Sequence, residues 1–229
     1  MGEMIQLKAG DGFLASAYVA QPKAAPRGAV VVLQEIFGVN AHIQAVANGF
    51  ALAGYLSIAP ATFDRVEKGV NLGYDEADRN KGFALKNQVE ALAAPGALAD
   101  VQAAIDWAAL NSRGRVGVVG YCWGGLLTWR SACLLNGVAA AVPYYGGGVT
   151  SEVERSRTPK CPVMAHFGER DHYIPMEGVE AFAKAHADVE VHVYPADHGF
   201  NCDHRGSYDE AATHLALERT LGFFLKHLG

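Results

Sequence analysis

The run Gly28-Ala-Val-Val-Val-Leu33 is the feature that most restricts the folds open to this chain. A continuous β-branched run, without the alternation of a half-exposed strand, is typical of a strand buried on both faces of a parallel sheet. Such burial requires helices on both sides of the sheet. The chain has 229 residues, of which 50% are hydrophobic, and this length suits one α/β domain over residues 1–229.

Strand-like and helix-like segments alternate along the chain, and this order predicts a mostly parallel central sheet with helices on both faces. We expect strands over residues 4–8, 13–20, 28–33, 55–59, 116–119, 138–142, 163–167 and 189–193. We expect helices over residues 42–53, 84–110 with an interruption near Pro95-Gly96, 126–135, 178–186 and 208–228. The first two strands have the pattern of an antiparallel edge pair, and the polar segment 62–81 is predicted to be a loop or short helices over a site.

The element Gly120-Tyr121-Cys122-Trp123-Gly124 lies between a predicted strand and a predicted helix. Its serine counterpart is the nucleophile elbow of α/β-hydrolases, a sharp turn in which side chains at the two glycine positions would clash with neighbouring backbone. The helix N-terminus favours a thiolate at Cys122. The alternative is a buried cysteine in an ordinary glycine-rich turn, whereas the sequence contains neither a phosphate-loop nor a dinucleotide-binding motif.

Two further polar segments follow predicted strands in the order that an α/β-hydrolase requires, which is nucleophile, acid and histidine. Asp171 lies just beyond the seventh predicted strand, and His198 lies just beyond the eighth. Because parallel strands gather chemistry at their carboxyl ends, we predict an α/β-hydrolase fold with a Cys122–Asp171–His198 triad. His198 would move the proton of Cys122, while Asp171 would orient and stabilise the imidazole. Asp197 is too close in sequence to reach the ring nitrogen.

The segments on either side of the nucleophile are expected to supply the oxyanion hole. The backbone N–H of Trp123 directly follows Cys122, and the N–H of Ile36 in the loop after the buried run is the second predicted donor. Glu35 would then lie close to the thiol, where its carboxylate would raise the pKa of Cys122 and keep the thiol neutral at rest. A simpler role, in which Glu35 only braces its loop, stays open.

Together these segments resemble the dienelactone hydrolase family, and the similarity extends from the first strands to Glu218-Arg219-Thr220. The residues that carry the resemblance are Gln34-Glu35-Ile36-Phe37-Gly38, Gly120-Tyr121-Cys122-Trp123-Gly124-Gly125, Tyr144-Tyr145-Gly146, Gly168-Glu169-Arg170-Asp171 and His198-Gly199-Phe200. The resemblance implies a carboxymethylenebutenolidase-like activity, in which a five-membered enol lactone bearing a carboxylate is hydrolysed to maleylacetate. It also implies that Glu35 interacts with the thiol at rest and that substrate binding swings this carboxylate away to free the thiolate.

Family members that act on dienelactone hold the substrate carboxylate with two arginines. Arg79, in Asp75-Glu-Ala-Asp-Arg79, matches the first of them. In those family members the second arginine lies four residues after the histidine. This chain has Cys202 at that position, and Arg205 lies three positions further on. Recognition of a carboxylate by a guanidinium group is geometrically demanding, so the sequence leaves the role of Arg205 open.

Several alternatives concern the site and its chemistry. Four aromatic residues are candidates either to line an acyl pocket or to pack around the site, namely Phe37, Trp123, Tyr144 and Tyr145. A broad carboxylesterase or thioesterase acting on small esters is the alternative within the hydrolases, and a redox-sensing relative with an oxidisable Cys122 is the alternative outside them. We expect no cofactor.

A metal protein is a third class of function. Its candidate ligands would be Asp171-His172, Asp197-His198 and Cys202-Asp203-His204. None of these has the local spacing of a zinc motif, so no metal site is predicted.

The charge of the chain excludes other classes of partner. The 19 basic residues are scattered and the formal net charge is −5, which predicts neither a nucleic-acid surface nor a membrane anchor. The first residues have no basic region followed by an apolar block, so we expect a cytoplasmic protein with reduced cysteines. The expected partner is a small-molecule ester or lactone, with an anionic group that Arg79 would orient.

Overall fold

The computed structural model describes residues 2–112 and 114–229 and is built on one eight-stranded sheet with the order β1-β2-β4-β3-β5-β6-β7-β8. The strands are β1 (Glu3–Lys8), β2 (Leu14–Ala20), β3 (Ala29–Leu33), β4 (Leu56–Pro60), β5 (Val116–Tyr121), β6 (Val138–Tyr144), β7 (Met164–Gly168) and β8 (Glu190–Tyr194). Strand β2 pairs antiparallel with β1 and β4, and the remaining pairs are parallel. The predicted mostly parallel sheet with an antiparallel edge is therefore confirmed.

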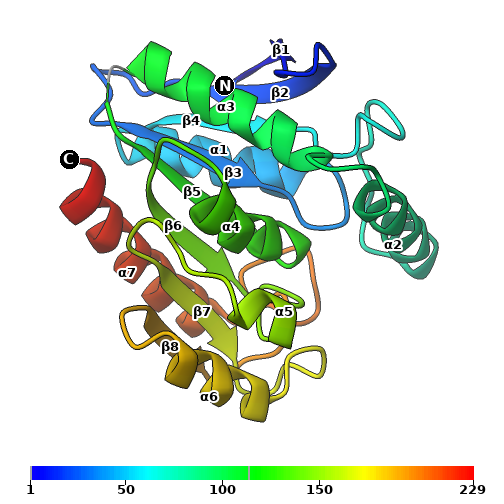
Figure 1. Ribbon diagram of the computed structural model, residues 1–229, viewed down its shortest axis with the longest axis vertical. Helices are drawn as coiled ribbons and strands as arrows, with labels where there is room; N and C mark the ends of the chain where they lie inside the picture. Colours follow the sequence, from blue (N-terminus) through cyan, green and yellow to red (C-terminus); the bar gives the residue numbers. More distant parts are fainter. Residues whose placement is uncertain (1, 113) are drawn as a thin grey trace.

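Helices cover both faces of this sheet (Figure 1). They are α1 (Ala41–Leu52), α2 (Glu76–Glu90), α3 (Ala97–Ser112), α4 (Trp123–Leu134), α5 (Glu152–Arg155), α6 (Met176–Ala185) and α7 (Glu210–Leu228). Helices α1 and α7 share one face, where Phe50 packs against Phe224 at 5.9 Å between ring centroids. Helices α4 and α6 share the other, where Trp129 packs against Phe182 at 5.0 Å. This two-sided covering explains the sequence of β3, whose five residues are all buried.

Helix α2 is the main departure from the elements predicted from the sequence. It begins at Glu76, inside the segment expected to be a loop or short helices, and it stands at one side of the sheet (Figure 1). Its start is fixed by Asp75, whose side chain accepts a hydrogen bond from the backbone N–H of Asp78 at 2.8 Å. Only Gly82, Leu85 and Val89 of this helix are buried. Because so little of it is buried, its apolar periodicity was too weak to predict the helix.

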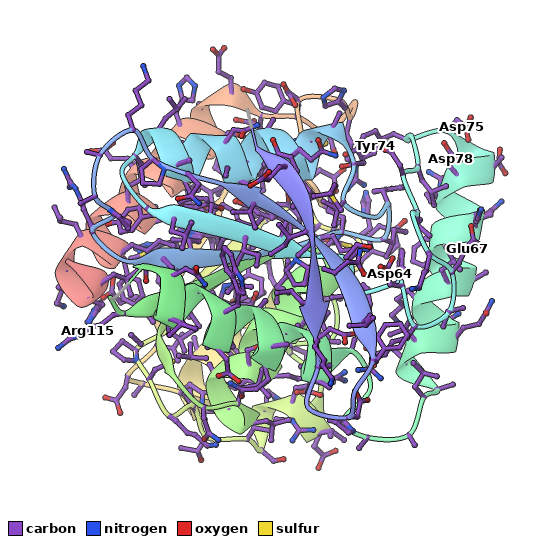
Figure 2. All side chains as sticks on the ribbon, turned by 90° about the horizontal axis from the view of Figure 1, so that it is seen from above. Asp64, Glu67, Tyr74, Asp75, Asp78 and Arg115 are labelled. Carbon is purple, nitrogen blue, oxygen red and sulfur yellow. The ribbon has the colours of Figure 1, made fainter. Side chains whose placement is uncertain are left out.

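Figure 2 shows which residues lie at two opposite sides of the sheet. Tyr74, Asp75 and Asp78 lie at the side where α2 stands, and Arg115 lies at the opposite side. Arg115 comes just before β5, and its Nη1 atom donates to the carbonyl oxygen of His227 in α7 at 3.2 Å. The amino end of β5 is thus covered by α7. The carboxyl end is where folds of this kind place their active sites.

The short helix α5 was not predicted, because four residues are too few to show a helical period. Among the described residues, no helix is both long and apolar enough to cross a bilayer. The parallel strands β5, β7 and β8 direct the segments that follow them to a common edge of the sheet.

Candidate active site

Cys122 occupies a sharp turn between β5 and α4. Its backbone has φ 56° and ψ −116°, a conformation that residues other than glycine rarely adopt and that costs roughly 1–3 kcal/mol. The turn is held from both sides, since the Cys122 N–H donates to the carbonyl of Tyr144 at 3.1 Å and its carbonyl accepts from Gly125 at 3.0 Å. The side chain of Cys122 is half-buried, whereas Tyr121 and Trp123 are buried. The strained turn therefore presents one accessible thiol at the carboxyl end of a central strand.

The two glycines that flank this turn are required by close backbone contacts. A Cβ atom on Gly120 would collide with the carbonyl oxygen of Gly124, and a Cβ atom on Gly124 would collide with the carbonyl oxygens of Leu33 and Gln34. These obstacles are backbone atoms, which cannot rotate away as a side chain can. The structure therefore confirms the backbone clashes that the sequence predicted for side chains at these two glycine positions.

His198 and Asp171 form a buried pair beside the turn. The imidazole Nδ1 atom of His198 lies 2.7 Å from Oδ2 of Asp171, and the two side chains are 7% and 0% exposed. Asp171 is itself held, because its Oδ1 atom accepts from the backbone N–H of Tyr173 at 2.8 Å. Asp197 accepts instead from the backbone N–H of His198 at 2.6 Å. The carboxylate that reaches the ring is therefore that of Asp171, as the sequence order predicted.

Cys122 acts electrostatically on His198. Burial by itself would lower the pKa of His198, but the negative charge of the Cys122 sulfur, a hydrogen bond with Asp171 and a hydrogen bond with Cys122 together raise it to about 10. A histidine with this pKa carries a proton at neutral pH. The raised pKa of His198 thus favours an imidazolium placed between the Asp171 carboxylate and the Cys122 sulfur.

Glu35 is buried and paired with Arg205. The Nη1 atom of Arg205 donates to Oε1 of Glu35 at 3.0 Å, and the two side chains are 20% and 1% exposed. The guanidinium group packs over Gly199, where a Cβ atom would collide with it, and φ at this glycine is 82°. Arg205 therefore reaches the site despite its shifted position in the sequence.

A cavity of about 400 Å³ opens beside the thiol. Its lining residues are Ile36, Phe37, Arg79, Phe83, Lys86, Glu90, Cys122, Trp123, Leu126, Arg130, Gly147, Gly148, Tyr173, His198 and Arg205. Seven of the eleven site residues named from the sequence line this cavity, and the four that do not are Glu35, Asp171, Tyr144 and Tyr145. The backbone N–H groups of Ile36 and Trp123 form no hydrogen bond to any other described residue, so both are available to an oxyanion.

Two of the four aromatic candidates lie outside this lining, so for them packing around the site is the role that the structure supports, of the two that the sequence left open. Tyr144 and Tyr145 are 1% and 0% exposed and pack behind the site. The hydroxyl of Tyr144 lies 2.7 Å from that of Thr220, and the ring of Tyr145 lies 5.2 Å from the ring of His198. Tyr144 is the last residue of β6 and Tyr145 follows it directly, so the sheet buries both, whereas Phe37 lies in the loop that forms the cavity wall.

Several cavity residues were not found from the sequence. Helix α2 contributes Phe83, Lys86 and Glu90 beside the predicted Arg79, and their spacing of three to four residues places them along one face of a helix. That spacing is the signal that could have revealed them, once the helix was known to begin at Glu76. Tyr173 was also missed, and its ring lies 5.0 Å from that of His198. The remaining lining residues that the sequence did not indicate are Leu126, Arg130, Gly147 and Gly148.

A second group of chemically active side chains lies next to Glu35. The ligand atoms of Glu35, His42 and Cys202 all lie within 4.8 Å of one another, and all three residues are buried. None of the metal ligands considered from sequence spacing combines these three residues. They come from distant parts of the chain, so only the fold brings them together.

The comparisons with known proteins agree with this geometry. The model of the dienelactone hydrolase family matches residues 15–228. This chain belongs to the dienelactone hydrolase family. The carboxymethylenebutenolidase of Pseudomonas putida is 33% identical to it over 228 residues, covering 96% of this chain and 95% of that protein. A provisionally assigned carboxymethylenebutenolidase of Salmonella typhimurium is 36% identical, covering 93% of this chain and 83% of that protein.

A solved structure gives the same result for the fold. A provisionally assigned dienelactone hydrolase from Klebsiella pneumoniae superposes with a TM-score of 0.82 at 31% identity, and the match covers 98% of each chain. The α/β-hydrolase fold predicted from the order of the motifs is therefore confirmed. As a member of the dienelactone hydrolase family, the chain is a hydrolase of that kind.

Proposed function

We propose that this protein hydrolyses a small lactone or ester bearing a carboxylate, through a Cys122–His198–Asp171 triad. The observation that carries the proposal is the 2.7 Å contact between His198 and Asp171 beside the strained turn of Cys122. Nucleophile, base and acid stand in the chain order of an α/β-hydrolase. All three side chains come from the carboxyl-end loops of parallel strands, where such folds place their chemistry.

The reaction would proceed in two steps. The Cys122 sulfur attacks the substrate carbonyl carbon, and the oxygen that becomes negative accepts hydrogen bonds from the N–H groups of Ile36 and Trp123. The carbon–oxygen bond of the ester or lactone then breaks, and protonated His198 gives its proton to the departing oxygen. In a lactone this oxygen stays attached to the rest of the molecule. Water, activated by the now neutral His198, hydrolyses the thioester to give the carboxylic acid and the free thiol.

The cavity supports an anionic substrate. Arg79 and Arg205 both line it, and a guanidinium group is the side chain best suited to hold a carboxylate. Arg79 is exposed and forms no ion pair with a described residue, so its charge is available to a ligand. The relative from Pseudomonas putida is named for its action on a carboxymethylene butenolide, an enol lactone that carries a carboxylate. We extend this substrate class to the present chain.

Glu35 would take part through its ion pair with Arg205. A substrate carboxylate that binds Arg205 competes with Glu35 for the same guanidinium group. Glu35 is then free to move relative to the thiol, which is the gating role expected from the family resemblance. The alternative, in which Glu35 only braces its loop, predicts that substrate binding leaves this ion pair intact.

The test is hydrolysis of cis- and trans-dienelactone, p-nitrophenyl acetate and a short acyl thioester by the wild type and by Cys122→Ala. We expect turnover to fall by at least about 10³-fold in the variant, with dienelactone preferred over the neutral ester by the wild type. Cys161→Ala is the matched control, because burial raises the pKa of this half-buried thiol to about 11 and its side chain lies outside the active-site cavity. Full activity in Cys122→Ala would refute the triad.

The preferred compound decides between substrate classes. A preference for p-nitrophenyl acetate or the thioester over both dienelactones would instead support a broad carboxylesterase, for which Phe83, Leu126 and Tyr173 provide apolar cavity lining. Oxidation of Cys122 by mild peroxide, in a protein that turns over none of the four compounds, would support the redox-sensing alternative.

A further inference from the structure

The buried group Glu35–His42–Cys202 lies beside the active site but is not used in the proposed reaction except through Glu35. Its three ligand atoms lie within 4.8 Å of one another. Glu35 and His42 are 1% and 4% exposed, and Cys202 is 0% exposed. Carboxylate oxygen, imidazole nitrogen and thiol sulfur are the three ligand types that zinc accepts from proteins.

Two of the three residues each carry a buried polar atom without a partner. The Oε2 atom of Glu35 and the Nε2 atom of His42 are buried and form no hydrogen bond with any described residue. A buried polar atom without a partner costs roughly 1–3 kcal/mol, so two of them in one small group require an explanation. Arg205 engages only the other carboxylate oxygen of Glu35, which leaves Oε2 directed elsewhere.

The surroundings of His42 prepare its ring as a ligand. Its Nδ1 atom lies 3.5 Å from Oδ1 of Asp203, and a carboxylate at this ring nitrogen fixes the proton there and leaves the lone pair on Nε2. The ring is buried, and its Nε2 atom has no hydrogen-bond partner among the described residues.

Cys202 supplies the soft ligand. Its side chain is fully buried, with its sulfur close to the Glu35 carboxylate. Binding of a thiophilic cation would displace the thiol proton to solvent and leave a thiolate on the ion. A tetrahedral zinc ion, with bonds of about 2.0–2.3 Å, spaces its ligands about 3.5 Å apart, so shifts of about 1 Å would close the set.

A second cavity borders one member of the group. His42 and Asp203 line a cavity of about 270 Å³ that shares no lining residue with the active-site cavity. A cation could therefore reach His42 without passing Cys122.

We propose that Glu35, His42 and Cys202 form a binding site for one thiophilic divalent transition-metal ion of the Zn²⁺ class, with a water as the remaining ligand. The site shares Glu35 with the proposed gating of the thiol but excludes Cys122 and His198, so metal binding can be tested separately from turnover. It differs from a catalytic metal centre in that no reacting atom contacts the ion. Asp203 is assigned as a positioning residue that acts through the His42 ring.

The test is titration of the metal-free full-length protein with Zn²⁺ by calorimetry, and with Co²⁺ by absorption spectroscopy. We expect one ion per chain in the wild type and in Cys122→Ser, with a thiolate-to-Co²⁺ charge-transfer band in both. His42→Phe and Cys202→Ser should weaken Zn²⁺ binding by at least about tenfold, which is about 1.4 kcal/mol, and Cys202→Ser should abolish the band. Asp203→Asn should weaken binding by about 10–100-fold.

The same experiment includes a control for correct folding of the variants and for the specificity of the site. His204→Asn removes a neighbouring exposed histidine, whose ring lies 6.2 Å from that of His42, and should bind Zn²⁺ like the wild type. Zn²⁺ should raise the melting temperature of the wild type and of His204→Asn but not of His42→Phe, since only a folded-state ligand stabilises. Loss of binding in Cys122→Ser with retention in His42→Phe would place the ion at the nucleophile and overturn the proposal. Absence of stoichiometric Zn²⁺ binding by the folded wild type would overturn it as well.

Discussion

Arg205 places its Nη1 atom 3.0 Å from Oε1 of Glu35, a contact that joins two residues 170 positions apart in the chain. It neutralises a carboxylate that is 1% exposed, which could not stay charged and unpaired in that environment. The same guanidinium group lines the active-site cavity. One residue thus stabilises the fold and faces the ligand, and substitutions at the two arginines of the cavity should have different consequences.

Arg205→Gln should destabilise the protein, because it leaves the Glu35 carboxylate buried without its cation. Breaking a buried ion pair in this way costs about 3 kcal/mol or more. For a chain of this size we expect the melting temperature to fall by about 6–12 °C, at about 2–4 °C per kcal/mol. Differential scanning calorimetry at neutral pH measures the change. An unaltered melting temperature would mean that the ion pair contributes nothing to stability.

Arg79→Gln should change specificity without changing stability. Arg79 is exposed on α2 and has no ion-pair partner among the described residues, so its loss leaves no buried charge. We expect KM for dienelactone to rise by about tenfold or more, as for the loss of a charge-assisted hydrogen bond of about 1.5–3 kcal/mol. KM for neutral p-nitrophenyl acetate should hardly change. An equal effect on both substrates would contradict an anion-binding role.

His198 should titrate far above an ordinary histidine. Burial lowers its pKa, but Cys122 and Asp171 raise it to about 10. Because the folded-state pKa is above the unfolded value of about 6.5, its protonation stabilises the fold fully below about pH 6.5, and this contribution is lost as pH rises through about 10. Nuclear magnetic resonance of the ring should report the high midpoint in the wild type. In Cys122→Ala the midpoint should fall, since the charge and hydrogen bond of the sulfur are removed.

Gly124→Ala should destroy the active site, because its Cβ atom would collide with the backbone carbonyls of Leu33 and Gln34. Either the turn at Cys122 shifts or β3 moves, and we expect kcat/KM to fall by at least about 10²-fold. Gly222→Ala is the matched control on α7, where an added Cβ meets nothing within 4 Å. It should keep full activity and gain roughly 0.5–1 kcal/mol of stability, as glycine in a helix is unfavourable. Equal activity in the two variants would argue against the steric explanation.

Local patterns determined the fold class and the order of the catalytic candidates. The β-branched run of β3, the alternation of strands with helices and the two glycines around Cys122 each follow from short-range geometry, which neighbouring residues encode directly. Asp171 and His198 could be found because the carboxyl ends of parallel strands lie at one edge of the sheet. These features need no knowledge of packing between distant segments.

Tertiary packing decided the remainder. Sequence register left Arg205 unassigned, and only the path of the loop after β8 shows its guanidinium group on Glu35. The extent of α2 was obscured because the helix buries few of its residues, and with it the cavity face that carries Phe83 and Lys86. The sequence left open whether Tyr144 lines the pocket or packs around the site, because a sequence does not show which side of a chain the sheet covers.

The group Glu35–His42–Cys202 has no counterpart in any local motif. Short-range regularities such as helix and strand periods can be predicted from neighbouring residues. The meeting of a loop carboxylate, a helix-start histidine and a cysteine from a distant loop depends on how all the elements pack. The sequence therefore determined the scaffold and the turn that carries Cys122, and the tertiary structure determined which buried polar side chains surround that turn.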